Sequence, residues 1–422
     1  MAGREMTVAY DVTRLVHRYA VPSPNGIDRI DLALARHFLD RPGTANVGVY
    51  LQAVRPSLFE TRGVASLLSE MDKNWRDGPP ASRTDYAGIK ARLLHGAPGR
   101  SAVEAARRDR PSLKRRLAPY RLLQPQALGR FLLAAVPRGA VFVHATHFHK
   151  PHLFRWLAQR PDVKPVFFIH DLLPLQFPEY FAPAHIAEHR RALGIFARRG
   201  HAAIVNTKVV EEQVRDFLRR RDRHDVPILV RPMPPDPIFS ATRPDPDLAA
   251  TPYFVVCGTI EPRKNHLMLL HVWRELSRQW GERTPALLVI GRRGWENENV
   301  VDLLDRSHEI RKHVVEIGDL PTADMARLIA GARALLMPSF AEGYGLPIVE
   351  ARAAGTPVVA SDIATFREAA PGATFRRPLD GVGWLGAIKA HAESVERRPR
   401  EGGSTRDAAA YFSTVDAFIE SL

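Results

Sequence analysis

The chain has 422 residues, and its 60 Lys and Arg against 46 Asp and Glu give a formal net charge of +14. This length exceeds one ordinary hydrophobic core, so we expect two domains. A composition of 45% hydrophobic and 25% charged residues excludes a chain that is disordered over most of its length. The positive charge indicates an anionic partner.

The cysteine content and the apolar runs indicate the compartment. Cys257 is the single cysteine, which excludes an intramolecular disulfide and favours a reducing compartment. The first residues lack the apolar segment of a signal peptide, and no apolar run approaches the roughly 18 residues that cross a membrane. We therefore expect a cytoplasmic protein.

Short apolar runs alternate with helical patterns along the first half of the chain. The expected strands lie at residues 7–12, 140–146, 165–171 and 202–206. The expected helices lie at residues 26–39, 151–159, 183–200 and 207–218. Strands that are apolar on both faces and alternate with helices predict a parallel sheet covered by helices on both sides.

A second series of the same kind follows. Its expected strands lie at residues 253–260, 286–291, 314–319, 334–339 and 357–362. Its expected helices lie at residues 265–280, 322–332 and 346–355. The prolines of residues 234–250 exclude a helix or a central strand there, so this segment is the expected linker.

The predicted fold class is α/β, with two doubly wound Rossmann-like domains whose parallel sheets face each other across a cleft. The first domain is expected at residues 1–238, the second at 239–395, and a loop with a closing helix at 396–422. Ligands of such folds bind at the carboxyl ends of the strands.

Much of the positive charge falls within residues 83–130, which contain twelve basic and three acidic residues. Apolar residues at loose helical spacing, such as Leu113, Leu117 and Tyr120, fit a helix lying on an anionic membrane surface. A solvated insertion is the alternative.

The stretch "EGYGLPIVEARAAG" begins at Glu342, after an expected strand. Gly343 and Gly345 allow a tight loop, and a helix is expected from Leu346 to the residue before Gly355, where glycine permits a left-handed cap. Glu342 then precedes this helix.

Glu350 lies about one turn inside the helix. The amide donors and dipole of the helix amino terminus attract phosphate, and a carboxylate beside it can accept hydrogen bonds from sugar hydroxyls. Each carboxylate also has a structural alternative: Glu342 as a simple cap, and Glu350 as a solvated helix residue.

Two cations follow the first strand of the second half. In "CGTIEPRKNH", Gly258 ends the expected strand and Arg263 and Lys264 open the next helix. Charge-assisted contacts to a pyrophosphate contribute about 1.5–3 kcal/mol each. The alternative is an ordinary basic loop.

Two positions in the first half attract attention. His170 follows an apolar strand with Asp171 beside it, although the chain has 17 histidines and most are expected to be structural. Gly26 opens a helix after the first strand, where a simple turn is the alternative. The stretch around Gly26 contains neither a G-x-G-x-x-G fingerprint nor a phosphate-loop motif.

Metal and hydrolase motifs are absent from the sequence: there is no H-E-x-x-H, no pair of cysteines and no G-x-S-x-G. The histidines of "HATHFHKPH" are expected to point in different directions, so no metal site is predicted.

Together these motifs resemble the retaining glycosyltransferases of family 4, which have the two-domain GT-B fold. The resemblance rests on "GTIEPRKN", "VIGRRGW", "PSFAEGYGLPIVEARAAGTPVVASD" and "HDLLPLQFPEYF". It covers nearly all of the second half and, more loosely, the first, whereas residues 50–135 match nothing.

The resemblance implies roles for individual residues. Arg263 and Lys264 would bind the pyrophosphate, Glu350 the ribose, and His170 the transferred sugar near its leaving group. Glu342 and the following loop backbone would hold the donor sugar and distal phosphate. His170, Glu342 and Lys264 are thus the predicted catalytic residues. The predicted donor-binding and acceptor-loop positions are Arg263, Lys264, Glu350, Gly343, Tyr344, Gly345, Leu346, Gly258 and Gly26.

The nucleobase would lie near Glu316 to Pro321. One departure from the family pattern is "IVNTKVV", with Asn206 and Thr207 where a serine is frequent. This departure puts the acceptor-side contact in question.

The resemblance implies transfer of a hexose, with mannose as the best guess, from GDP-mannose or a UDP-sugar to a lipid-linked glycan or polysaccharide. No cofactor or metal is expected, because cationic side chains and a helix terminus stabilise the leaving diphosphate. Peripheral attachment to the inner face of the cytoplasmic membrane is expected through residues 83–130. The alternatives are a sugar-nucleotide epimerase of the same fold and, because of the charge, a nucleic-acid-binding protein; no specific nucleic acid is predicted.

Overall fold

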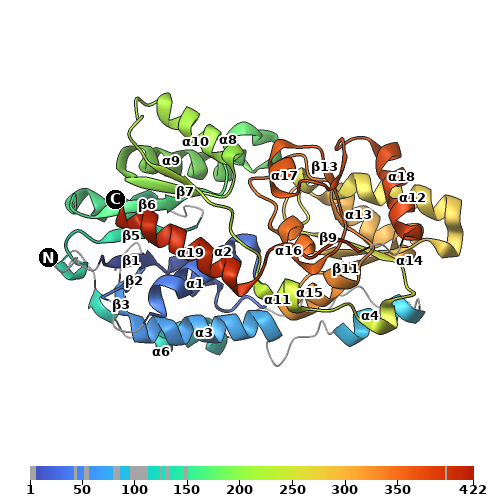
Figure 1. Ribbon diagram of the computed structural model, residues 1–422, viewed down its shortest axis with the longest axis horizontal. Helices are drawn as coiled ribbons and strands as arrows, with labels where there is room; N and C mark the ends of the chain where they lie inside the picture. The colour runs from blue at the N-terminus through green and yellow to red at the C-terminus, as the bar shows by residue number, and fades with distance from the viewer. Residues whose placement is uncertain are drawn as a thin grey trace. The chain divides into compact units, whose positions relative to one another are not determined.

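The computed structural model describes residues 6–41, 45–51, 57–78, 86–95, 113–123, 125–128, 134–146, 151–394 and 397–422. These residues fold into two compact units (Figure 1). The first unit consists of the described residues within 1–74, 111–233 and 409–422, and the second of those within 75–110 and 234–408.

The units differ from the predicted domain bounds in two helices and in the boundary between the halves, which falls after residue 233 instead of 238. Helix α4 (Tyr86–His95) belongs to the second unit, because Ile89 joins that unit's core and Tyr86 donates a hydrogen bond to Asp245 Oδ2 at 2.8 Å. Most of helix α19 (Thr405–Glu420) belongs to the first unit, where Asp416 Oδ1 lies 2.7 Å from His37 Nε2. Long-range contacts, rather than chain order, decide both placements.

The first unit contains an eight-stranded sheet of order β4-β3-β2-β1-β5-β6-β7-β8. The strands are β1 (Val8–Asp11), β2 (Val47–Tyr50), β3 (Ser57–Glu60), β4 (Pro125–Leu128), β5 (Val141–His144), β6 (Lys164–Phe168), β7 (Ala202–Val205) and β8 (Ile228–Val230). The pairs that join β1, β5, β6 and β7 are parallel, as predicted. Strands β2 and β8, which were not among the expected strands, also pair in parallel, whereas β3 pairs antiparallel with both β2 and β4. The sequence patterns did not predict this antiparallel edge.

Helices and short 3₁₀ segments connect these strands. They are α1 (Thr13–Arg18), α2 (Gly26–Leu39), α3 (Thr61–Asp77), α6 (Leu113–Leu122), η1 (Pro151–Gln159), α8 (Leu173–Gln176), η2 (Pro178–Tyr180), α9 (Pro183–Arg199) and α10 (Lys208–Arg219). The predicted α-helix at 151–159 is a 3₁₀ helix instead.

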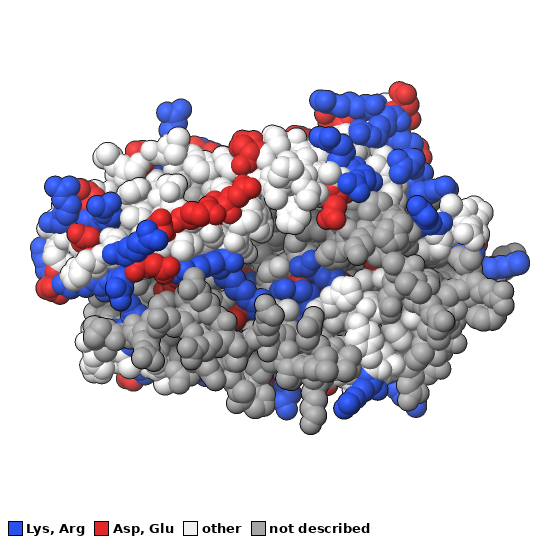
Figure 2. Space-filling model, turned by 180° about the vertical axis from the view of Figure 1, so that it is seen from behind, with Lys and Arg blue, Asp and Glu red and all other residues white. Residues whose placement is uncertain are grey.

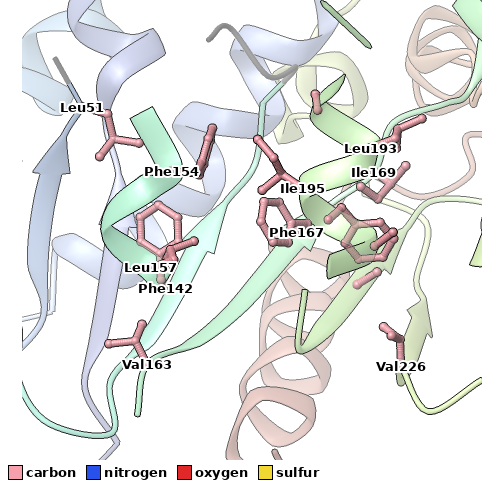
Figure 3. Packing of buried hydrophobic residues seen from close by; sticks show 14 of the residues in the cluster. Leu51, Phe142, Phe154, Leu157, Val163, Phe167, Ile169, Leu193, Ile195 and Val226 are labelled. Carbon is pink, nitrogen blue, oxygen red and sulfur yellow. The ribbon is translucent and has the colours of Figure 1, made fainter. Parts of the chain in front are cut away.

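Aromatic side chains fill the core of the first unit (Figure 3). The ring of Phe154 lies 6.4 Å from that of Phe142 and 6.2 Å from that of Phe167, measured between centroids. Phe167 also meets Phe196 of α9 edge to face, at 5.6 Å. These contacts join β5 and β6 to η1 and α9, which fixes the ends of both strands.

The second unit contains a six-stranded sheet of order β11-β10-β9-β12-β13-β14, and all its pairs are parallel. The strands are β9 (Tyr253–Cys257), β10 (Ala286–Ile290), β11 (Val314–Ile317), β12 (Leu335–Met337), β13 (Val358–Ser361) and β14 (Thr374–Arg376). Its α-helices, besides α4 and the start of α19, are α11 (Pro237–Ala241), α12 (His266–Trp280), α13 (Glu298–Arg306), α14 (His308–His313), α15 (Thr322–Gly331), α16 (Leu346–Ala354), α17 (Ala364–Ala369) and α18 (Gly381–Glu393). The expectation that residues 234–250 contain no helix is therefore wrong for α11, because Pro237 lies in the first turn, where proline is tolerated. The order β10-β9-β12 places the ends of β9 and β12 side by side.

None of the helices in the described residues combines the length and apolar character needed to cross a membrane. Figure 2 shows Lys and Arg side chains gathered at its upper right, over α9 and α10, where Arg190, Arg191, Arg198 and Arg199 are exposed.

We predict that Phe167→Ala lowers the free energy of unfolding of the first unit by about 3–5 kcal/mol, because a completely buried ring leaves a cavity. Hydrogen exchange of the β5 and β7 peptides would measure this unit separately from the other. Phe177→Ala is the control, because this side chain of the same unit is 36% exposed. It should lower the free energy of unfolding much less. If both variants protect the backbone amides of β5 and β7 from exchange equally, the described core is wrong.

Candidate functional site

The loop before α16 in the second unit has the predicted form. Gly345 precedes the helix with φ of +93° and Gly355 follows it with φ of +73°, so both occupy the left-handed region that glycine tolerates. A Cβ atom on Gly345 would lie 2.7 Å from Phe366 Cε1, so the loop also packs too closely for a side chain. The predicted helix from Leu346 to Ala354 is confirmed.

Glu342 joins this loop to the loop after β9. Its Oε2 accepts a hydrogen bond from Arg263 Nη1 at 2.6 Å, and its Oε1 forms an ion pair with Lys264 Nζ. Ser339 Oγ donates to the same Oε1 at 2.8 Å. The structure therefore brings Arg263, Lys264 and Glu342 together, as the sequence predicted.

The charge on Glu342 is stabilised in a buried position. Burial by itself would raise the pKa of this carboxyl, but the charges of Arg263 and Lys264 and hydrogen bonds from Lys264 and Ser339 lower the pKa to about 2. Glu342 is therefore ionised at neutral pH. It is not the simple helix cap of the alternative, because its oxygens bind side chains rather than helix amides.

Glu261 is a further member of this cluster, and the sequence analysis did not single it out. Its Oε1 lies 2.6 Å from Arg263 Nη2, and the residue is only 5% exposed. Burial is the largest influence on this carboxyl and raises its pKa. Its position in the sequence could have indicated this role, because Glu261 lies two residues before Arg263 within "GTIEPRKN", one of the motifs that carry the resemblance.

Backbone contacts hold the two cations in place. Gly258, with φ of +140°, leaves room for Lys264, whose Nζ would lie 3.4 Å from a Cβ at this position. The side-chain Nδ2 of Asn265 donates to the carbonyl oxygens of Pro338 and Pro378 at 3.1 and 2.9 Å, and Phe340 N donates to Arg263 O at 2.8 Å. The loop after β9 is therefore tied to the loop after β12.

Glu350 is buried, with 1% of its surface exposed, so the alternative of a solvated helix residue is wrong. Tyr344, in the loop before the helix, has a raised pKa, first because of burial and then because of the negative charge of Glu350. The carboxylate therefore lies near the glycine loop, inside the unit.

His170 lies in the first unit, two residues after β6. It is 8% exposed, and its Nε2 lies 2.8 Å from Ala145 O. Because a carbonyl only accepts, Nε2 carries a proton and, in the neutral ring, Nδ1 has the lone pair. Burial lowers the pKa of His170 to about 4, so the ring is neutral at pH 7.

A second pair at the same edge of this sheet escaped the sequence analysis. Asp11 ends β1 and His144 ends β5, and Asp11 Oδ2 lies 2.7 Å from His144 Nδ1. Asp11 Oδ1 also accepts hydrogen bonds from the amide and hydroxyl of Thr13. Ala145, which follows His144, supplies the carbonyl that orients His170.

Gly26 opens α2 behind a capping box. Asn25 accepts from the amide of Asp28, and Asp28 accepts from the amide of Asn25, both at 2.9 Å. Arg14 and Arg18 of α1 form ion pairs with Asp28 at 2.8 and 2.6 Å. The weak turn signal at Gly26 therefore corresponds to a firmly anchored helix start.

Asn206 and Thr207, the departure from the family pattern, have structural partners. Asn206 Oδ1 accepts from Met233 N at 3.0 Å, and the Thr207 hydroxyl accepts from Val210 N at 3.2 Å as the cap of α10. Both are almost fully buried.

Glu316, within the predicted base region, accepts hydrogen bonds from Arg293 at 2.8 and 2.7 Å. Among the described residues, no group of three or more His, Cys, Asp or Glu is placed to hold a metal ion. His147 and His149 lie outside the described residues.

Comparison with known proteins supports the resemblance. The sequence family described as "Glycosyl transferases group 1" matches residues 242–372. That match contains Gly258, Arg263, Lys264, Glu342 and Glu350, and so includes every predicted donor-binding residue of the second unit.

The chain is similar to characterised mannosyltransferases. It is 29% identical over 223 residues to the serotype-specific mannosyltransferase WbdA of Escherichia coli, a match to 48% of this chain and 26% of WbdA. It is 39% identical over 121 residues to the O-antigen chain mannosyltransferase B of Escherichia coli, covering 29% of this chain and 31% of that protein. The chain thus spans less than a third of the length of these relatives.

Solved structures share the fold over almost the whole chain. HepE from Anabaena, solved with UDP, has a TM-score of 0.59 at 14% identity and covers 99% of this chain and 100% of its own. Sucrose-phosphate synthase from Thermosynechococcus elongatus has a TM-score of 0.58 at 14% identity, covering 99% and 98%.

These findings show a chain of the GT-B fold, in which residues 242–372 of the second unit are similar to the group 1 glycosyl transferases. The chain resembles the mannosyltransferases that build bacterial polysaccharides.

We predict that Gly345→Ala destabilises the second unit more than Gly372→Ala does. Both alanines must adopt a positive φ, which costs about 1–2 kcal/mol, but only at Gly345 does the new Cβ meet another atom, Phe366 Cε1, at 2.7 Å. Urea unfolding of the two variants would measure the difference. Equal midpoints would mean that the loop is not packed as described.

Proposed function

We propose that the protein transfers a hexose, best taken as mannose, from a nucleoside-diphosphate sugar to a lipid-linked glycan or polysaccharide, with retention of configuration. The observation that carries this proposal is the contact of Arg263 and Lys264 with Glu342, beside the glycine loop and the amino terminus of α16.

A nucleoside diphosphate suits the chemistry of this cluster. Arg263 and Lys264 have side chains that are 15% and 12% exposed, so their charges are poorly screened by water. The amino terminus of α16 carries the positive end of the helix dipole, which favours a phosphate group. A diphosphate would compete with Glu342 for the two cations and release its carboxylate to accept hydrogen bonds from the donor sugar.

Glu350 is proposed to bind the ribose. Its carboxyl group is buried near the glycine loop, and carboxyl oxygens accept hydrogen bonds from the hydroxyls of a ribose. GDP-mannose is the favoured donor because the similar proteins are named as mannosyltransferases, and a UDP-sugar is the alternative.

The proposed reaction proceeds on one face of the donor sugar. The bond between the anomeric carbon and the phosphate oxygen breaks, and the nucleoside diphosphate leaves with the electron pair. The acceptor hydroxyl attacks the same face, forms the new glycosidic bond and gives its proton to the departing phosphate oxygen. Lys264, Arg263 and the helix terminus stabilise the leaving charge, so no metal or other cofactor is required.

His170 is proposed to contact the transferred sugar. It is a neutral imidazole at the carboxyl end of β6, and its Nε2 donates to Ala145 O, which fixes the orientation of the ring.

The cellular context is also a proposal. We infer a cytoplasmic enzyme that is attached peripherally to anionic lipid, each nearby cation contributing about 1 kcal/mol. Much of the predicted attachment segment, 83–130, lies outside the described residues, so the exposed arginines of α9 are the described support for this inference.

The epimerase alternative shares the donor site and differs only in its product. Incubation with labelled sugar nucleotide and a lipid-linked glycan should give an elongated glycan, and release of free epimer instead would favour the alternative. A nucleic-acid-binding protein would show salt-dependent affinity for nucleic acid that survives Glu342→Ala.

We predict that Lys264→Ala weakens the binding of the free nucleoside diphosphate about 10- to 100-fold, the equivalent of one charge-assisted contact. Calorimetry with GDP and UDP would measure the loss. Lys312→Ala is the control, because Lys312 belongs to the same unit and pairs with Glu282 but is 42% exposed.

The ligand would first be chosen by thermal stabilisation with a panel of sugar nucleotides, since a ligand at 100 times its Kd adds about 2.7 kcal/mol. Unchanged affinity in Lys264→Ala would refute the donor site.

A further inference from the structure

A cluster of three side chains in the first unit has no part in the proposed reaction. Tyr50 Oη lies 3.0 Å from Tyr120 Oη and 3.0 Å from His17 Nε2. These residues come from three separate segments, β2, α6 and α1. We call them the His17–Tyr50–Tyr120 cluster.

The middle residue of the cluster is buried and the outer two are exposed. Tyr50 is 3% exposed, whereas Tyr120 is 47% exposed and His17 is exposed as well. The ring of Tyr50 stacks on Phe59 at 6.3 Å and meets His17 edge to face at 5.7 Å. A rigid buried phenol therefore holds two surface rings in fixed positions.

The polar atoms of the cluster form a continuous chain. A phenol hydroxyl can both donate and accept a hydrogen bond, and a neutral imidazole has one N–H donor and one nitrogen acceptor. Burial and the hydrogen bond to Tyr120 raise the pKa of Tyr50, so it remains an uncharged phenol at neutral pH. The Tyr120 hydroxyl and the His17 imidazole, at the two ends of this hydrogen-bonded series, can each form further hydrogen bonds.

The cluster lies where an acceptor is expected to bind. Tyr50 is the last residue of β2 and so lies at the carboxyl edge of the sheet, where α/β folds bind ligands. His17 is on α1, the same helix whose Arg14 and Arg18 hold Asp28 beside Gly26. One short helix therefore connects the cluster to the predicted acceptor loop.

We propose that the His17–Tyr50–Tyr120 cluster is a saccharide subsite that binds one pyranose unit of the acceptor glycan. A pyranose has an apolar C–H face, which packs on an exposed aromatic ring, and a rim of hydroxyls, which both donate and accept hydrogen bonds. The aromatic ring of Tyr120 would pack on the C–H face of the pyranose. The hydroxyls of Tyr50 and Tyr120 and the imidazole of His17 would form hydrogen bonds with its hydroxyl groups. This inference deepens the proposed function and rests on it for the identity of the saccharide as acceptor.

The test is saccharide binding by the full chain, measured by saturation-transfer NMR and titration with a linear mannose oligosaccharide. Tyr120→Ala should weaken binding about tenfold, the equivalent of one aromatic contact. Tyr120→Phe keeps the ring and loses the hydroxyl, so its affinity for the oligosaccharide should lie between those of the wild type and Tyr120→Ala. Leu379→Ala, at a 77% exposed side chain of the second unit, is the matched control and should bind normally.

Two outcomes would overturn the subsite: no binding by the wild type, or equal binding by Tyr120→Ala with an unchanged circular dichroism spectrum. The same variants would also be titrated with the sugar nucleotide, whose affinity Tyr120→Ala should leave unchanged. Tyr120-dependent saccharide binding without any sugar-nucleotide binding would sink the transferase proposal and leave the subsite standing. If the protein binds the sugar nucleotide but binds the saccharide equally well with and without Tyr120, the subsite proposal is wrong and the transferase proposal stands.

Discussion

The ion cluster of Glu342 with Arg263 and Lys264 is the interaction on which the second unit's site depends. Three charged groups are held in a region largely shielded from water, where each would be costly alone. Their mutual attraction holds the loop after β9 against the loop after β12, and the Asn265 and Phe340 hydrogen bonds reinforce that contact. The same cluster carries the charges that a nucleoside diphosphate needs. Packing and proposed chemistry therefore rely on the same side chains.

The first unit combines ion pairs with neutral polar groups near the ends of its strands. Asp11 pairs with His144, and Asp28 pairs with Arg14 and Arg18. Besides these pairs, His170 is buried with a lowered pKa and a backbone partner, and Tyr50 is a buried phenol between two surface rings. Neutral donors and acceptors of this kind suit the hydroxyls of sugars, whereas the charged cluster of the second unit suits phosphate.

The most predictable parts of the fold were those with local signals. The glycine loop, the helix start at Leu346 and the cap at Gly355 follow from backbone preferences that act over a few residues. The antiparallel strands β3 and β4 were missed, because their edge position gives neither a long apolar run nor a helical partner. The Asp11–His144 pair was missed as well, since 133 positions separate the two residues and only sheet order makes them neighbours.

The sequence by itself determined that two α/β halves exist and that Arg263, Lys264, Glu342 and Glu350 follow strands of one sheet, because hydrophobic periodicity and turn residues are local properties. Only the tertiary structure decided that Glu342 binds both cations and that Glu350 is buried. It also decided that α4 belongs to the second unit and most of α19 to the first, although the chain order predicts the opposite. Side-chain pairing and burial depend on which strands become neighbours. That order is set by the packing of the whole unit rather than by any short stretch of residues.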